Sequence, residues 1–269
     1  MTASVDTRPL TGSLDAGGAS LLLGIGPVVR KEIHEWFASR RAAILLAISS
    51  LMMVLLTLNA RLALWSASAG HVTLPANISV DPTINVLAKW PQWYFFFAIV
   101  FTASLVVSER EHGTLDWSLS KPLSRTALLL GKWVAAVAML IAFGLVVPMA
   151  LSTAVAVVAY GMPDLGAIAV ATVLLATVPV FFAALTIALG AVLPSQVAVA
   201  GIAFAVAVAP GLIGTFLPDV AAALPPSSGP WAVAVALGAP AGPWTPIGWF
   251  VGCAVVGILG IAAFRRGDL

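Results

Sequence analysis

Long apolar stretches alternate with short polar segments along this chain, and six of the stretches approach the length of a membrane span, about 20 residues. The fourth and fifth are separated only by Pro194-Ser195, which is typical of a tight turn. The second is short, but it can extend on both sides. The six stretches are residues 42–60, 93–107, 133–159, 165–193, 196–217 and 247–264. The pattern predicts an all-α integral membrane protein with six transmembrane helices.

The composition supports the same fold class. The 269 residues are 61% hydrophobic and 9% charged, whereas soluble domains carry about 25% charged residues. A protein core alone cannot use this much apolar surface, so lipid must be the main solvent. The single cysteine, Cys253, excludes an internal disulfide and a cysteine-based metal cluster.

The placement of positive charge predicts the orientation. Lys and Arg are enriched in the cytoplasmic segments of membrane proteins. With a cytoplasmic N-terminus and six spans, only Arg61 and Lys89 lie outside, and both termini are cytoplasmic. The other positions then lie inside: Arg8, Arg30, Lys31, Arg40, Arg41, Arg110, Lys121, Arg125, Lys132, Arg265 and Arg266.

Tryptophan placement agrees with this orientation, because the indole ring favours the headgroup zone. One group of tryptophans falls near the predicted outer boundary and another near the inner boundary. The outer group is Trp65, Trp90, Trp93, Trp231, Trp244 and Trp249; the inner group is Trp36, Trp117 and Trp133.

The N-terminal segment has two predicted parts. Residues 1–25 are expected to form a disordered cytoplasmic tail, and no cleavable signal peptide is expected, because the first long apolar run starts only near Ala42. Residues 27–41 show helical periodicity, which predicts an amphipathic helix in the plane of the inner leaflet. Its apolar stripe is Val29, Ile33, Trp36 and Phe37, and its opposite face is Arg30, Lys31, His34 and Glu35. A plain basic flank of the first span is the alternative.

A proline-rich segment precedes the last span. Residues 218–246 contain seven prolines, and the apolar piece between them, Trp231 to Leu237, is too short to span. We expect helical pieces broken by proline that dip into the outer leaflet. Such backbone must be shielded from lipid by protein.

Several chemistries are disfavoured by what the sequence lacks. None of the histidines, His34, His71 and His112, lies in a predicted span, so no catalytic or metal site is expected. The last four predicted spans have no ionisable residue in their interiors, which disfavours a proton relay. Gly131-Lys132 lacks the other glycine of a P-loop. The chain is therefore not expected to be an enzyme, and energy for uphill transport would come from a partner.

Charge is concentrated in residues 108–125, between the second and third predicted spans. Gly113 and Pro122 predict two breaks around a short helix, and Ser124 is placed to cap the next helix. Trp117 and Leu119 give this segment an apolar side. Mixed charge around apolar anchors suits a protein contact, with a solvated charged loop as the alternative. The charged residues include Glu109, Glu111, Asp116, Lys121 and Arg125.

These motifs resemble those of ABC-2-type transporter permeases. The family's loop pattern has glutamates, then Gly-Thr-Leu, a proline, a small residue with arginine, and a later Gly-Lys. It is matched by Glu109, Glu111, Gly113, Thr114, Leu115, Pro122, Ser124, Arg125, Gly131 and Lys132. The segment around Arg30, Lys31, Glu32, Ile33 and Arg40 is similar to the family's elbow helix. Among subgroups, the chain looks closest to the small permeases that include the membrane subunit of the nitrous-oxide-reductase maturation transporter, although His112 and Trp117 depart from that pattern.

The resemblance implies a permease domain over residues 26–269 that exports an amphipathic or lipid-like substrate from the bacterial cytoplasmic (inner) membrane. Partners would be cytoplasmic ATPase subunits, which bind ATP and Mg²⁺, a second permease protomer and membrane lipid; no nucleic acid is expected. The coupling residues would be Glu109, Glu111, Gly113, Thr114, Leu115, Trp117, Pro122 and Arg125. The in-plane helix would use Val29, Arg30, Lys31, Glu32, Ile33, Trp36 and Phe37.

Two other function classes compete with this interpretation. A non-transporting membrane scaffold or assembly factor would need no nucleotide-driven motion. A secondary carrier would transport without ATP. A neighbouring gene for a P-loop ATPase would favour the permease over the scaffold.

Overall fold

The computed structural model describes residues 24–69, 79–111 and 125–266. The tail expected at residues 1–25 lies outside the described residues, except for its last two positions. Most of the charged segment, residues 112–124, also lies outside them.

The described chain is helical, with no strand among these residues, and six helical stretches are long and apolar enough to cross a membrane. The six-helix prediction is confirmed, and the chain is a multi-pass membrane protein. The first three stretches are each longer than the apolar runs that predicted them. The six are Arg41–Ser68, Pro82–Glu109, Thr126–Tyr160, Leu165–Val192, Gln196–Ile213 and Trp244–Ala263.

Several spans consist of more than one helix. The first three spans and their connections contain α1 (Ile25–Ala38), α2 (Arg41–Ser68), α3 (Pro82–Leu87), α4 (Trp90–Thr102), α5 (Ser104–Glu111), α7 (Arg125–Met139), the π-helix η1 (Leu140–Val146) and α8 (Val147–Tyr160). The last three contain α9 (Leu165–Leu175), α10 (Thr177–Val192), α11 (Gln196–Ile213), α12 (Pro218–Ala223), the 3₁₀-helix η2 (Pro225–Ser227), α13 (Ser228–Ala236) and α14 (Trp244–Arg266).

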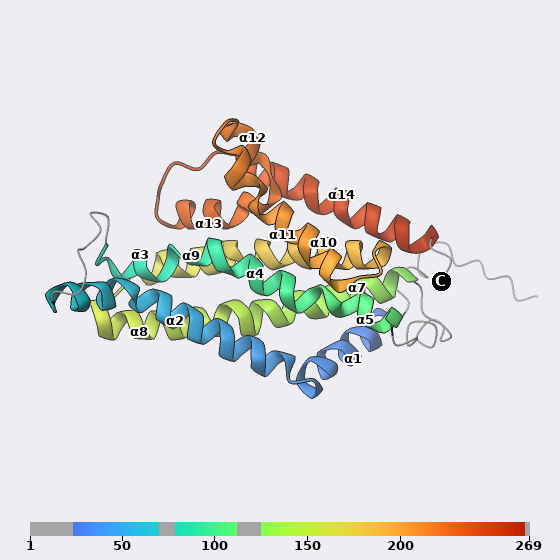
Figure 1. Ribbon diagram of the computed structural model, residues 1–269, viewed down its shortest axis with the longest axis horizontal. Helices are drawn as coiled ribbons and strands as arrows, with labels where there is room; N and C mark the ends of the chain where they lie inside the picture. The colour runs from blue at the N-terminus through green and yellow to red at the C-terminus, as the bar shows by residue number, and fades with distance from the viewer. Residues whose placement is uncertain (1–23, 70–78, 112–124, 267–269) are drawn as a thin grey trace, which may run out of the picture.

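The helices form an elongated bundle (Figure 1). Packed pairs include α2 with α8, α1 with α7, and α10 with both α4 and α14. Helix α1, the end of α5, the beginning of α7 and the end of α14 gather at one end of the long axis, and α3 lies at the other (Figure 1). The end of α5 and the beginning of α7, which flank residues 112–124 in sequence, therefore lie beside α1.

The core is built around α4 and α10. Trp90, Tyr94 and Phe97 of α4 are buried at helical spacing, and α10 contributes buried Phe182. Thr102 and Thr186 share a buried hydrogen bond of 2.7 Å between these two helices. By contrast, α11 and α14 are mostly exposed: only 11% and 6% of their apolar windows are buried, against 50% for Pro82–Glu109. The outer faces of these two helices are apolar and suit contact with lipid.

A π-helical segment interrupts the third span. Pro148 follows it and has no N–H to donate to a carbonyl one turn back, which favours a local change of helix geometry. Tyr94 Oη donates to the Leu140 carbonyl at 3.2 Å. Ser49 Oγ lies 3.2 Å from the Phe143 carbonyl and 2.6 Å from the Leu45 carbonyl, so its proton is shared between them. Polar groups of α2 and α4 thus support the irregular backbone that lipid could not.

The broken segment before the last span has the predicted form of short helices. Pro218 opens α12 and Pro225 opens η2, and α13 follows before α14 begins. Two glycines of α14 allow its close packing against this segment: a side chain at Gly248 would meet Ala223, and one at Gly252 would meet Pro225. Helices α12 and η2 therefore pack closely against α14.

Candidate functional site

Helix α1 lies against α7 through one buried face. Val28, Glu32 and Trp36 are spaced four residues apart and are all buried. Gly131 of α7 makes the contact possible, because a Cβ at that position would lie 2.5 Å from Val28 Cγ1. The next residue, Lys132, therefore faces α1 at close range.

Lys132 forms a buried ion pair with Glu32. The Lys132 Nζ lies 2.7 Å from Glu32 Oε1, and the two side chains are only 2% and 3% exposed. Lys132 belongs to the third apolar stretch, Thr126–Tyr160. This helix extends seven residues further toward the N-terminus than predicted, so it includes Lys132, whereas the predicted span at residues 133–159 contains no ionisable residue. Carboxylates from other helices make the buried charge tolerable.

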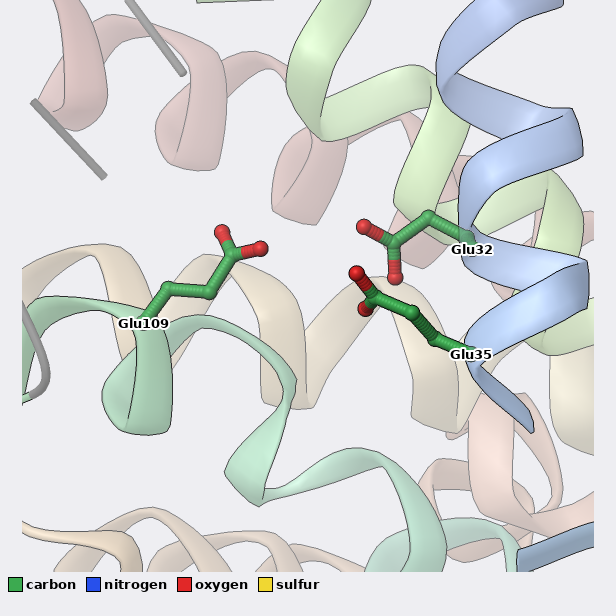
Figure 2. Close-up of side chains that lie close together, drawn as sticks. All are labelled: Glu32, Glu35 and Glu109. Atoms are coloured by element: carbon green, nitrogen blue, oxygen red, sulfur yellow. The ribbon is translucent and has the colours of Figure 1, made fainter. Parts of the chain in front are cut away.

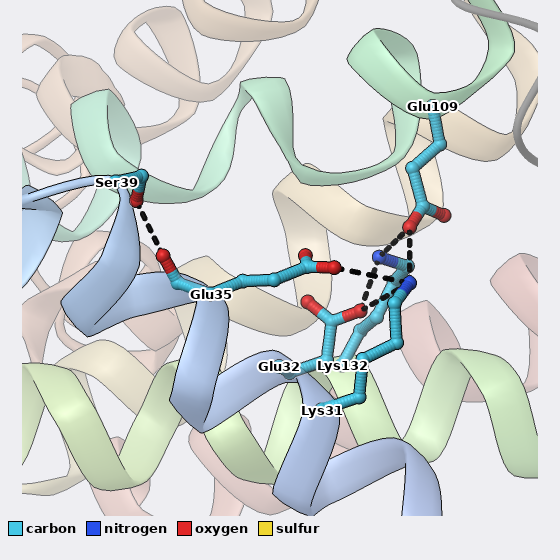
Figure 3. A network of polar contacts seen from close by, with 6 residues as sticks. All are labelled: Lys31, Glu32, Glu35, Ser39, Glu109 and Lys132. Carbon is cyan, nitrogen blue, oxygen red and sulfur yellow. Dashed lines mark hydrogen bonds and ion pairs between the residues drawn. The ribbon is translucent and has the colours of Figure 1, made fainter.

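Helix α5 joins the same network through Glu109. Its Oε1 lies 2.9 Å from Lys132 Nζ and 3.3 Å from Lys31 Nζ. Lys31 also lies 3.3 Å from Glu35, one turn along α1. Figure 3 shows how these side chains converge from three helices. We call Lys31, Glu32, Glu35, Glu109 and Lys132 the α1–α5–α7 ion cluster.

Burial and attraction oppose each other in this cluster. Burial raises the pKa of Glu32, and the nearby Lys132 ammonium offsets only part of that rise. Burial lowers the pKa of Lys31, but the carboxylates of Glu109, Glu35 and Glu32 outweigh burial, so the net direction is upward. Taking paired charges out of water gives little net stability, whereas removing one partner leaves the other uncompensated. The main effect of the cluster is therefore to determine how α1, α5 and α7 pack against one another. Its net contribution to stability is small.

The three carboxylates of the cluster lie close enough to one another to be considered as metal ligands. Carboxylate oxygens of Glu32, Glu35 and Glu109 lie within 4.8 Å of one another (Figure 2). The ammonium groups of Lys31 and Lys132 contact the same oxygens (Figure 3). These lysines already supply the positive charge that a cation would bring, so the geometry is that of an ion-pair network.

Comparison with protein families decides what kind of protein carries this arrangement. A profile of the ABC-2 family transporter proteins matches residues 27–227, which include all but the first two residues of α1, the ion cluster and the first five spans. The chain belongs to the ABC-2 transporter family. It is thus the membrane subunit of an ABC transporter, a type of subunit that associates with ABC ATPases and is not itself the ATPase. No curated protein matches the chain as a relative.

Within this permease, the residues predicted for the in-plane helix divide between protein and surface. Arg30 and Lys31 are exposed, and Val29 and Ile33 are half-buried. Phe37 is 55% exposed and meets Phe143 edge to face.

Two of these predicted residues face the bundle. Trp36 is 1% exposed and stacks on Phe101 of α4, so its ring faces protein and not lipid; its predicted depth near the inner boundary stays a prediction. Trp90, placed at the outer boundary, is likewise buried in the core. Glu32 lies on the buried face with Trp36. The predicted apolar stripe shares only Trp36 with this buried face. The charged Glu32 conceals the face in a pattern based on apolar residues.

The predicted coupling residues are only partly described. Glu109 enters the ion cluster, and Glu111 is exposed at the end of α5. Arg125 is the first residue of α7. Gly113, Thr114, Leu115, Trp117 and Pro122 lie outside the described residues. The structure thus gives Glu109 partners within its own chain, where the sequence pattern indicated an ATPase.

Sequence reasoning treated Lys132 only as a family motif residue and an inner positive charge. Two signals pointed to its pairing. A lone lysine inside an apolar helix requires a partner, and Glu32 lies four residues from both Val28 and Trp36 on what is otherwise an apolar face. Identifying the pair required the contact between α1 and α7, which no local pattern shows.

Proposed function

We propose that this permease is a subunit of an ATP-driven exporter in the bacterial cytoplasmic membrane, coupled to its ATPase through residues 108–125. ATP and Mg²⁺ are bound by the ATPase subunits. Leu115 and Trp117 anchor in an ATPase groove, and Glu111 and Arg125 set the register. The family match supports the ATPase partner, and the mixed charge of the segment suits a protein contact.

The observation that carries this proposal is the position of the ion cluster. Glu109 lies near the end of α5, two residues before the helix ends, and Lys132 lies two turns into α7. Both pair within the cluster with charged residues of α1. A force applied to the intervening segment therefore moves α5, α7 and α1 together, because separating them would leave buried charges unpaired.

Orientation and assembly follow from charge and composition. The excess of Lys and Arg at the end that carries α1 and the C-terminus favours a cytoplasmic location for that end. Two protomers pair, as the transported substrate needs a path between subunits. The apolar spans favour an amphipathic or lipid-like substrate. The sixth span, with 6% of its window buried, offers the most surface for such contacts.

The first experiment is affinity purification of the full-length chain from its host in mild detergent, followed by mass spectrometry. A P-loop ATPase is expected among the retained proteins. The Leu115→Asp/Trp117→Asp variant is expected to lose that ATPase and its activity in the purified complex, because charge in an apolar anchor disfavours docking.

The control is Ser68→Asp, which adds charge at the opposite end of the bundle, where Ser68 is exposed. It should retain the ATPase. Normal ATPase binding and turnover in the double variant would contradict the proposed coupling segment. A wild-type chain that retains no ATPase would favour the scaffold function.

A further inference from the structure

An apolar cavity lies between α7, α10 and α14, on the side of α7 away from the ion cluster. Its volume is about 380 Å³. Trp133 of α7, Ile187 of α10, and Trp249, Phe250 and Gly257 of α14 are among its lining residues. Phe250 is 67% exposed, so the cavity is open to the surface as a groove.

Apart from the thiol of Cys253, which is a weak hydrogen-bond donor, the groove offers no free polar side chain to a ligand. None of its lining residues is charged. Its two indole N–H groups are already used: Trp133 Nε1 donates to the Val180 carbonyl and Trp249 Nε1 to the Thr177 carbonyl, both at 3.0 Å. A polar group placed here would be desolvated without compensation. The occupant must therefore be hydrocarbon.

The dimensions of the groove fit a narrow, extended occupant. Along α14 the lining runs from Trp249 to Ile261, which is about 18 Å at 1.5 Å per residue. A volume of about 380 Å³ over that length gives a groove narrower than a helix with its side chains, which is about 10–12 Å across. A single chain of methylene groups fits such a groove, because carbon atoms pack at about 3.5–4.0 Å. A helix from a second protomer is too wide to fill it.

The glycines of α14 show that the space is not a by-product of tight helix packing. At Gly260 a Cβ would lie 2.7 Å from Ala188 Cβ, so this glycine is needed where α14 touches α10. At Gly257, one turn away, a Cβ would meet nothing within 4 Å. Gly257 therefore leaves room that no neighbouring side chain uses.

We propose that this groove binds one acyl chain of a membrane phospholipid as a resident lipid. Both α7 and α14 belong to membrane-spanning stretches, so the groove opens toward lipid, which supplies the occupant. Filling the groove with an alkyl chain restores dispersion contacts that an empty groove would lack. The proposal is independent of the exporter function, because a resident lipid requires neither ATP nor transport.

The test is lipid retention by the full-length chain. The protein is reconstituted into vesicles of phosphatidylethanolamine and phosphatidylglycerol with brominated acyl chains and then extracted and washed in mild detergent. Native mass spectrometry counts the brominated lipid that stays bound. Tryptophan fluorescence serves as a second readout, since bromine beside Trp133 and Trp249 quenches their emission.

Gly257→Leu places a side chain in the groove from a position where a Cβ meets nothing within 4 Å. Gly201→Leu is its matched control, because Gly201 of α11 also has nothing within 4 Å of its Cβ position. Wild type and Gly201→Leu should retain one phospholipid and show quenching. Gly257→Leu should retain about tenfold less, which corresponds to about 1.4 kcal/mol. If Gly257→Leu does not fold, Ala254→Phe on the same groove wall replaces it.

Unchanged retention and quenching in a folded groove variant would overturn the proposal. So would a variant that keeps its lipid but changes from dimer to monomer, since the groove would then be a contact between protomers. Loss of lipid in both variants, Gly201→Leu included, would also overturn it, because retention would not depend on the groove.

Discussion

Two neighbouring residues of α7 serve two contrasting regions of the permease. Lys132 points into the α1–α5–α7 ion cluster, where buried charges fix three helices to one another. Trp133 lines the apolar groove, where α14 leaves space unfilled. The ion cluster restricts the relative movement of α1, α5 and α7, because each buried charge requires its partner. The groove makes no directional contact with its occupant. Helix α7 therefore has one face that is fixed by ion pairs and another that makes only non-directional apolar contacts.

The largest effect that distinguishes the two regions is expected from Lys132→Met. It removes the ammonium group 2.7 Å from the buried Glu32 and leaves only Lys31, at 4.0 Å, which costs about 3–5 kcal/mol. The free energy of unfolding in detergent, from denaturant titration, measures it. The half-buried Lys89 at the other end of the bundle provides the control, and Lys89→Met should cost much less.

A double substitution sharpens the same point. Glu32→Leu/Lys132→Met removes both charges, so its cost should be smaller than that of Lys132→Met alone. Glu109 keeps Lys31 at 3.3 Å in this variant. If the double variant loses as much stability as Glu32→Leu and Lys132→Met lose together, the ion pair stabilises the fold rather than only determining which helices meet, which would contradict this account.

The next largest effect is expected from the packing that brings Lys132 to α1. Gly131→Ala should destabilise the protein by about 1–3 kcal/mol, because its Cβ would overlap Val28. Val28→Ala in the same chain should recover part of the loss. Thermal unfolding of the single and double variants tests this. Equal stability of Gly131→Ala and wild type would show that α1 moves away freely.

A smaller effect should appear at the groove. Gly257→Ala should stabilise the protein by about 0.5–1 kcal/mol, since alanine favours helix and meets nothing there. Gly260→Ala should destabilise it, because its Cβ would overlap Ala188. The pair differs by one turn of α14 and can be compared by unfolding in detergent. Destabilisation of similar size at both positions would contradict an open groove.

The smallest expected effect is the pH dependence of the cluster. The pKa of Glu32 is raised in the folded protein, so the folded state holds this proton more tightly than the unfolded chain. The resulting stabilisation is complete below the unfolded pKa of 4.5 and is lost as pH rises through the raised folded value. Wild type should therefore gain stability relative to Glu32→Gln as pH falls from neutral toward 4.5. If wild type instead loses stability relative to Glu32→Gln as pH falls over this range, the predicted direction of the pH dependence is wrong.

Hydropathy was enough to predict the six spans, because each needs only length and apolar composition. The prolines at 218 and 225 likewise predicted the broken segment, since proline restricts where helices begin. The direction of individual side chains was less accessible. The sequence does not show that the Trp36 side chain faces the core, because its neighbour Phe101 comes from α4.

The candidate site shows the same limit. Glu109 was identified from its local pattern, yet its partners, Lys31 and Lys132, are 78 and 23 residues away in sequence. The groove depends on the register between α14 and α10, which decides that Gly260 touches Ala188 and Gly257 touches nothing. Sequence patterns give the helices, whereas these sites arise from how the helices meet.

The π-helical segment of the third span has a consequence for biogenesis. Its Leu140 and Phe143 carbonyls accept hydrogen bonds from Tyr94 and Ser49, which belong to the second and first spans. The chain is synthesised from its N-terminus, so both donors leave the ribosome before the irregular segment does. The irregular segment is therefore synthesised after Tyr94 and Ser49, the residues that donate hydrogen bonds to its carbonyls.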